Sequence, residues 1–182
     1  FVASGEHMAP PTRFPTDKII RNGDIVFIDI GACWNGYFGD CGRAKTAGGP
    51  PHPMQIKVYT TVYKALKAGI DKMRPGYTND DSAAEFLEVA RSAGLEENFI
   101  KLFIGHGCGI SPNEPPYVGE VMPGAESVEF KPGMTFAIEP LIFVPGIPGG
   151  AGVRIEDHIL VTDGDPVYMT RAPYCQELIE QD

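Results

Sequence analysis

A short segment near the N-terminus, Gly23–Gly42, constrains the fold of this chain more than any other. Ile25–Ile30 is an apolar, β-branched run that is typical of a strand. The pair Asn35-Gly36 follows, and it strongly favours a two-residue hairpin turn because both turn positions require a positive φ. The sequence therefore predicts a β-hairpin whose returning strand includes Tyr37–Asp40.

Each predicted hairpin strand carries an aspartate, a residue that strands disfavour. Asp29 lies in the first strand and Asp40 in the second, and neither lies in the turn, where an aspartate is expected. A carboxylate in apolar surroundings must be paired with a base, protonated or bound to a cation. Arg43 and Arg154 are the available bases, so ion pairing and metal binding are both open at this point.

Three more residues extend this pattern. Glu139 interrupts the apolar run Met134–Val144, and Glu156 interrupts Gly152–Thr162, so two further predicted strands carry an acid. His106 stands between glycines in GHGCG. Four carboxylates and one imidazole suit Mn²⁺, Fe²⁺, Co²⁺ or Zn²⁺, and four negative charges balance two divalent ions. We therefore predict a dinuclear site with the ligands Asp29, Asp40, His106, Glu139 and Glu156.

Two stretches have apolar residues at every third or fourth position, which predicts amphipathic helices over Met54–Met73 and Asp81–Ala93. Asn79 or Asp80 is the expected N-terminal cap of the second helix. A last short strand is expected over Val167–Thr170.

The remaining segments are predicted to be mostly irregular. Prolines argue against regular structure in Phe1–Asn22 and in Ser111–Pro132. The second segment is expected to form the rim of a pocket, with Tyr117 and Phe130 as its walls. A short strand, Ile100–Ile104, should lead into the glycine-flanked histidine.

Composition excludes several classes of protein. The net charge of −9 argues against binding to nucleic acid or to an anionic membrane. No apolar run is long enough to predict a membrane span. The four cysteines lack the spacing of a zinc or redox motif, which favours a reducing compartment, and we expect a cytoplasmic protein.

Five separated stretches carry a resemblance to a known family: GDIVFIDIG, GYFGDCGR, GHGCG, KPGMTFAIEP and GVRIEDHILVT. In order and spacing they resemble the pita-bread metallohydrolases, which include methionine aminopeptidase, Xaa-Pro aminopeptidase, prolidase and creatinase. The resemblance implies an α+β fold, with a curved, mostly antiparallel sheet and helices on its convex face. It also implies one catalytic domain over residues 1–182 that lacks its N-terminal helix and any preceding domain, and a homodimer.

The same resemblance implies a function and a set of site residues. It is closest to the Xaa-Pro peptidases, which implies hydrolysis of a C–N bond in a short peptide or small molecule by a hydroxide held between two divalent ions. The family's metal ligands match the five residues predicted above. Glu139 would also move the proton of the attacking water, and Arg154 would help to bind substrate.

Two positions depart from the peptidases of this family. Thr12 and Asn113 stand where those enzymes have histidines near the metals. Neither side chain can transfer a proton near neutral pH. The expected catalytic residues are Glu139, Arg154 and Asn113. The departures leave three alternatives: creatinase-like amidinohydrolysis, a sulfonium lyase reaction and a binding module without catalysis.

Overall fold

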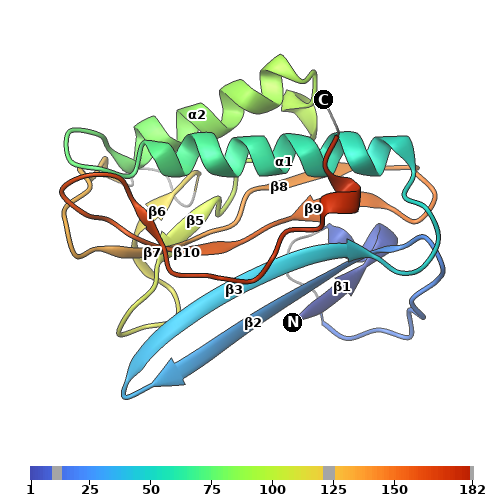
Figure 1. Cartoon of the computed structure of the whole chain (residues 1–182), viewed down its shortest axis with the longest axis horizontal. Coiled ribbons are helices and arrows are strands. Elements are labelled where there is room, and N and C mark those ends of the chain that lie inside the picture. Colours follow the sequence, from blue (N-terminus) through green and yellow to red (C-terminus); the bar gives the residue numbers. More distant parts are fainter. Residues whose placement is uncertain (10–13, 121–125, 181–182) are drawn as a thin grey trace.

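The predicted hairpin is present, and it is longer than the sequence indicated. Its strands are β2 (Ile25–Trp34) and β3 (Tyr37–Thr46), which pair in register from Trp34↔Tyr37 to Ile25↔Thr46. Asn35 and Gly36 have φ values of 49° and 85°, as the two-residue turn requires. The hairpin extends well beyond the neighbouring strand β1 (Figure 1).

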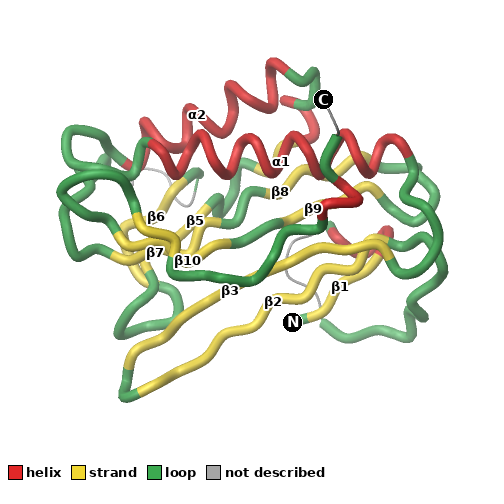
Figure 2. Tube along the Cα trace, viewed as in Figure 1, coloured by secondary structure: helices red, strands yellow, loops and turns green. Residues whose placement is uncertain are grey.

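The computed structural model describes residues 1–9, 14–120 and 126–180, and in these residues every named strand pair is antiparallel. Three sheets have the orders β1-β2-β3, β11-β10-β7-β5-β6 and β4-β8-β9. The helices α1 and α2 lie together on one side of the sheets (Figure 1, Figure 2). The remaining strands are β1 (Val2–Ser4), β4 (Phe99–Ile100), β5 (Gly105–Gly107), β6 (Glu114–Val118), β7 (Thr135–Ile138), β8 (Leu141–Val144), β9 (Ala151–Arg154), β10 (Asp157–Leu160) and β11 (Val167–Tyr168).

Both predicted helices form, and each begins with a capping box. In α1 (Pro53–Asp71), His52 Nδ1 accepts from the Met54 N–H while the Gln55 side chain accepts from the His52 N–H. In α2 (Asn79–Ser92) the cap is Thr78, so the predicted cap at Asn79 or Asp80 was wrong by one or two residues. Within the described residues, neither helix combines the length and the apolar character needed to cross a membrane. Short 3₁₀ helices cover Gly5–Met8 (η1), Glu96–Asn98 (η2) and Gln176–Leu178 (η3).

Two predicted strands are each broken at their acidic residue. Met134–Val144 separates into β7 and β8 around Glu139-Pro140, because proline has no N–H to donate to a ladder. Gly152–Thr162 separates into β9 and β10 around Ile155 and Glu156. In both cases the two halves belong to different sheets. The breaks therefore place both glutamates where the sheets meet.

Three other predictions were wrong in detail. The predicted strand Ile100–Ile104 is mostly loop, and His106 lies within a strand of its own, β5. Phe1–Asn22 is not wholly irregular, because it contains β1 and η1. Both short elements pack against the hairpin or β9, and these tertiary contacts have no signal in local sequence.

The segment Ser111–Pro132 also differs from its prediction, because it contains β6. Phe130 is not a pocket wall: its side chain is buried in the core, with its ring 5.4 Å from that of Phe136. Tyr117 packs edge-on against Phe103, at 5.7 Å between ring centroids.

The buried apolar residues form one cluster. The helices α1 and α2 pack against each other within this cluster. Gly69 of α1 faces the fully buried ring of Phe86 in α2. A Cβ atom at position 69 would overlap that ring, so the contact requires a glycine.

Gly69→Ala therefore tests the helix packing. Alanine gains about 1 kcal/mol of helix propensity over glycine, but overpacking a core typically costs about 1–3 kcal/mol. We expect the net result, measured in urea, to be a fall in the free energy of unfolding of up to about 2 kcal/mol. Lys64→Ala, at an exposed position on α1, is the control and should change it little. An increase in stability for Gly69→Ala would contradict this account of the packing.

Candidate functional site

The two hairpin aspartates point from the same face of the hairpin. Asp29 of β2 lies opposite Gly42, and Asp40 of β3 lies opposite Gly31. Side chains alternate between the two faces of a strand, so Asp29, Gly31, Asp40 and Gly42 all share one face. Both carboxylates therefore project toward the same region, although they come from different strands.

The other predicted ligands reach this region from the remaining two sheets. His106 lies in β5, and Glu139 follows β7, where its N–H donates to the Ile104 carbonyl at 2.8 Å. Glu156 lies between β9 and β10 and forms an isolated bridge with Gly42. Its N–H donates to the Gly42 carbonyl at 3.0 Å. This backbone bridge holds Glu156 beside the hairpin.

All five predicted ligand residues come together in two overlapping groups. One ligand atom each from Asp40, His106 and Glu156 lie within 4.8 Å of one another. The same holds for Asp29, Glu139 and Glu156. Glu156 belongs to both groups, so its carboxylate stands at the centre of the cluster.

The cluster concentrates negative charge at side chains that are buried or half-buried. Burial and the neighbouring Asp40 carboxylate raise the pKa of Asp29 to about 6. Burial, Glu139 and the hairpin aspartates raise the pKa of Glu156 well above its ordinary value. Within the described part of the chain, Glu156 Oε2 is the one buried side-chain oxygen or nitrogen without a hydrogen-bond partner. An orphaned, buried carboxylate oxygen among other carboxylates fits a cation site.

Glu139 lies between two nitrogen bases. Its Oε2 forms an ion pair with Arg154, and its Oε1 lies 3.4 Å from His106 Nε2. His106 Nδ1 lies 3.0 Å from the Gly107 carbonyl, to which it donates in the tautomer that leaves Nε2 facing the acids. Burial alone would lower the pKa of His106, but the bonds to Glu139 and Gly107 raise it above its ordinary value. Of the two candidate bases, Arg154 is thus the one that pairs with a cluster acid.

Arg43 has a different partner, which the sequence analysis did not single out. Its guanidinium binds the Asp157 carboxylate at 2.7 Å and also donates to the Glu156, Gly42 and Ala172 carbonyls. Arg43 therefore fixes the backbone on both sides of the Glu156 bridge. The available signal was a second acid, directly after Glu156, in the same apolar stretch.

Gly42 is needed for close approach at the same bridge. A Cβ atom there would lie 2.6 Å from the Phe27 ring and 2.7 Å from Glu156 Oε2. The Phe27 ring is fully buried, and the Arg154 guanidinium lies 5.7 Å from its centroid. The missing side chain at position 42 leaves room for both the ring and the central carboxylate.

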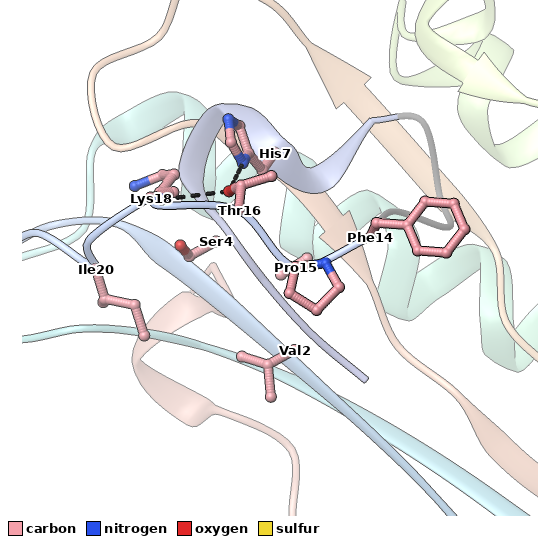
Figure 3. Close-up of a pocket in the computed structure, with 9 residues that line it drawn as sticks. Val2, Ser4, His7, Phe14, Pro15, Thr16, Lys18 and Ile20 are labelled. Carbon is pink, nitrogen blue, oxygen red and sulfur yellow. Dashed lines mark hydrogen bonds between the residues drawn. The ribbon is translucent and has the colours of Figure 1, made fainter.

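One departure from the peptidase pattern, Asn113, is not joined to this cluster. Asn113 is exposed, and its backbone bonds to Ser111, while its side chain makes no hydrogen bond within the described ranges. Thr12 lies outside the described residues. His7 lines a separate cavity of about 200 Å³, where its Nδ1 is 3.3 Å from Thr16 Oγ1 (Figure 3). The catalytic role given to Asn113 stays a prediction.

Comparison with known proteins places the chain among metallopeptidases. A sequence model of metallopeptidase family M24 matches residues 1–163. The chain is 36% identical over 174 residues to the probable dipeptidase PepE of Mycobacterium tuberculosis, covering 95% of this chain and 44% of that protein. It is 33% identical over 170 residues to the Xaa-Pro dipeptidase of Pyrococcus furiosus, covering 93% of this chain and 46% of that protein. The chain thus spans less than half the length of these relatives.

The fold agrees with solved structures of such proteins. The crystal structure of a dipeptidase from Pyrococcus horikoshii superposes with a TM-score of 0.84 and 40% identity, covering 95% of this chain and 46% of that one. The predicted family resemblance and the predicted α+β pita-bread fold are therefore confirmed.

The raised carboxyl pKa values predict an unusual pH dependence for the protein stripped of metal by a chelator. A pKa of Asp29 raised to about 6 from 3.8 means that the folded state holds a proton which the unfolded state has lost. This contribution to stability is complete below about 4 and is lost as the pH rises through about 6. We expect the melting temperature to fall over that interval, and Asp29→Asn to reduce the fall.

Melting temperatures measured in a pH series, with chelator present throughout, check this expectation. The control is Asp163→Asn, which removes an exposed carboxylate that makes no contact with the cluster. Equal pH profiles for the parent protein and Asp29→Asn would contradict the proposed origin of the pH dependence.

Proposed function

Because the chain belongs to metallopeptidase family M24, we propose that it carries the active site of a divalent-metal-dependent hydrolase that cleaves a C–N bond, with Xaa-Pro dipeptides as the closest substrate class. The main support is the convergence of three carboxylates and one imidazole on the carboxylate of Glu156, one oxygen of which has no hydrogen-bond partner in the described residues. The relatives named as dipeptidases support the peptide substrate.

The metal ligands that we propose are Asp29, Asp40, His106, Glu139 and Glu156, which would hold two divalent ions. Two overlapping groups of possible ligand atoms, which share Glu156, support this number. Oxygen ligands with one imidazole nitrogen are compatible with Mn²⁺, Co²⁺, Fe²⁺ or Zn²⁺. The location in the cytoplasm and the homodimer stay predictions.

Divalent ions bound at this cluster would polarise the scissile carbonyl and lower the pKa of the attacking water. Glu139 would then accept the proton of the attacking water and deliver it to the departing nitrogen. Its carboxylate is suited to this role because Arg154 and His106 contact its two oxygens and fix its orientation. Arg154, which lies beside this carboxylate, would also help to bind a substrate carboxylate.

A second candidate function is C–N cleavage of a non-peptide substrate, or a lyase reaction, on the same residues. The exposed Asn113, which lacks any bond to the cluster, favours it because no imidazole stands there to assist a leaving amine. A binding module without catalysis is the weaker alternative, since all five candidate ligands are retained and converge.

The first experiment is hydrolysis of an Xaa-Pro dipeptide by the Mn²⁺-loaded protein, followed by mass spectrometry, with bound metal quantified in the same sample. We expect hydrolysis, and we expect Glu139→Gln to reduce kcat by about 10²–10⁴, the usual range for losing a positioned proton-transfer group. The control is Glu97→Gln, at an exposed acid that makes no contact with the cluster.

Two outcomes would contradict the peptidase proposal in different ways. A protein with two metal ions bound but no dipeptide hydrolysis would favour amidine, cyclic amide or sulfonium substrates. A protein that purifies without metal and takes up neither Mn²⁺ nor Co²⁺ would favour a binding module.

Glu156→Gln provides a test that does not depend on the substrate. Removing the central negative charge relieves repulsion in the metal-free protein, so its melting temperature should rise, by about 2–4 °C for each kcal/mol relieved. The same change removes a proposed ligand, so the further rise on adding Mn²⁺ should shrink. Thermal melts with chelator and with Mn²⁺ measure both effects. Destabilisation of the chelated protein by Glu156→Gln would argue against the repulsion described above.

A further inference from the structure

A cavity of about 370 Å³ lies between the hairpin and the C-terminal segment 169–172. Its lining residues come from three places in the sequence: Ile30, Ala32 and Phe38–Cys41 from the hairpin, His158 from β10, and Met169–Ala172 after β11. The volume is within the range of small-molecule sites. This cavity differs from the cavity of Figure 3 and contains no cluster acid except Asp40.

Most of the cavity lining lies on the hairpin face opposite the carboxylate cluster, although Phe38 and Asp40 belong to the cluster's own face. Ile30, Ala32, Gly39 and Cys41 alternate with the residues on the cluster side of the hairpin, so they belong to the opposite face. The Asp40 carboxylate accepts from the Cys41 N–H at 3.0 Å and shares a group with two other cluster residues, so it is directed to the cluster side.

His158 supplies a hydrogen-bond donor to this cavity. The N–H of Asp40 donates to His158 Nδ1 at 3.1 Å. An imidazole nitrogen that accepts a hydrogen bond carries no proton, so in the neutral ring the proton is on Nε2. Nε2 has no partner in the described chain, and it is not a buried orphan atom, so it is accessible from the cavity that His158 lines.

The orientation of this imidazole is fixed. The side chain of His158 is largely buried, and the backbone N–H of the same residue donates to Thr170 Oγ1 at 2.8 Å. A donor held in this way pays little entropy on binding a ligand.

Arg171 adds a positive charge to the same cavity. It is exposed, and it forms no hydrogen bond or ion pair with any residue that the structure describes. Its guanidinium is therefore available to an anionic ligand. The side chains of Ile30, Ala32 and Met169 make the other walls apolar.

We propose that this cavity is a binding site for a small carboxylate with an apolar tail, whose carboxylate receives the His158 Nε2–H and pairs with Arg171 while its tail packs on Ile30, Ala32 and Met169. The source of the carboxylate is either a free acid or the C-terminus of a short peptide. The site adjoins the proposed metal cluster through Asp40, but neither His158 nor Arg171 is among the proposed metal ligands.

Titration calorimetry of the whole, metal-loaded chain tests the proposal with three probes. These are 4-methylpentanoate, its uncharged amide and N-acetyl-alanyl-leucine. We expect the free acid or the peptide to bind at least about tenfold more tightly than the amide, because hydrogen bonds to a charged group are the stronger ones. The tighter of the two carboxylates identifies the source. Equal affinity for acid and amide, or no binding by any probe, would overturn the proposal.

Two variants assign the binding to this cavity, because a carboxylate can also bind a metal ion at the cluster. Arg171→Gln should weaken carboxylate binding about tenfold, and Ala32→Phe should abolish it by filling the cavity. The matched controls are Lys131→Gln, at another exposed cation, and Ile28→Phe, on the same exposed hairpin face outside the cavity lining. Carboxylate binding that persists unchanged in both Arg171→Gln and Ala32→Phe would place it elsewhere and sink the proposal.

Nitrogen-15 chemical shifts of the His158 imidazole give a second measurement, which does not depend on the heat of binding. Addition of the bound carboxylate to the Zn²⁺-loaded protein should move the Nε2 signal of His158 and leave that of His52 unchanged, since His52 caps α1 at a different place. A titration that leaves the His158 signal unmoved would exclude its role as the donor. Metal content measured on the same samples separates a failure of this site from a failure of the proposed hydrolase function.

Discussion

The backbone bridge between Gly42 and Glu156 is the interaction on which the site depends. It joins the hairpin sheet to the point where the chain passes between the other two sheets. Arg43 strengthens this junction by donating to both bridge carbonyls and pairing with Asp157. Without the junction, nothing in the backbone would fix the distance between the acids of the hairpin and the acids at the breaks of the other strands. A backbone contact, rather than any side chain of the cluster, thus sets the spacing of the carboxylates.

The cluster is the least favourable part of the molecule for a chain alone in water. Carboxylates in low dielectric repel one another, and Arg154 supplies only one buried positive charge, which is paired with Glu139. Such an arrangement persists because the surrounding core holds the backbone in place independently of the charges. The same preorganisation means that a cation entering the site meets ligands that are already oriented. The free energy that carboxylate repulsion costs the metal-free chain is thereby recovered when a cation binds.

Local pattern was sufficient to predict the hairpin and to single out the four acids and one histidine that converge, because each acid interrupts an apolar run and the histidine stands between glycines. It failed where tertiary contacts decide. The apolar run around Glu139-Pro140 has the composition of one strand, but its halves pair with different partners. Phe130 follows a proline-rich stretch and looks like part of a loop, yet its neighbours in space make it core. His158 gave no signal at all, because a histidine in an apolar strand is indistinguishable from a core residue until its neighbours are known.

The crowding at Gly42 limits how this site can change over evolutionary time. Any side chain there meets the Phe27 ring and Glu156 Oε2, so even a small residue such as threonine cannot be introduced by itself. The ring at position 27 must first become smaller, and that change alone leaves a cavity in the core. The two positions are therefore epistatic, with each single step unfavourable and only the pair acceptable. Proteins that have both this glycine and this phenylalanine therefore rarely change either residue, even where the metal ligands stay the same.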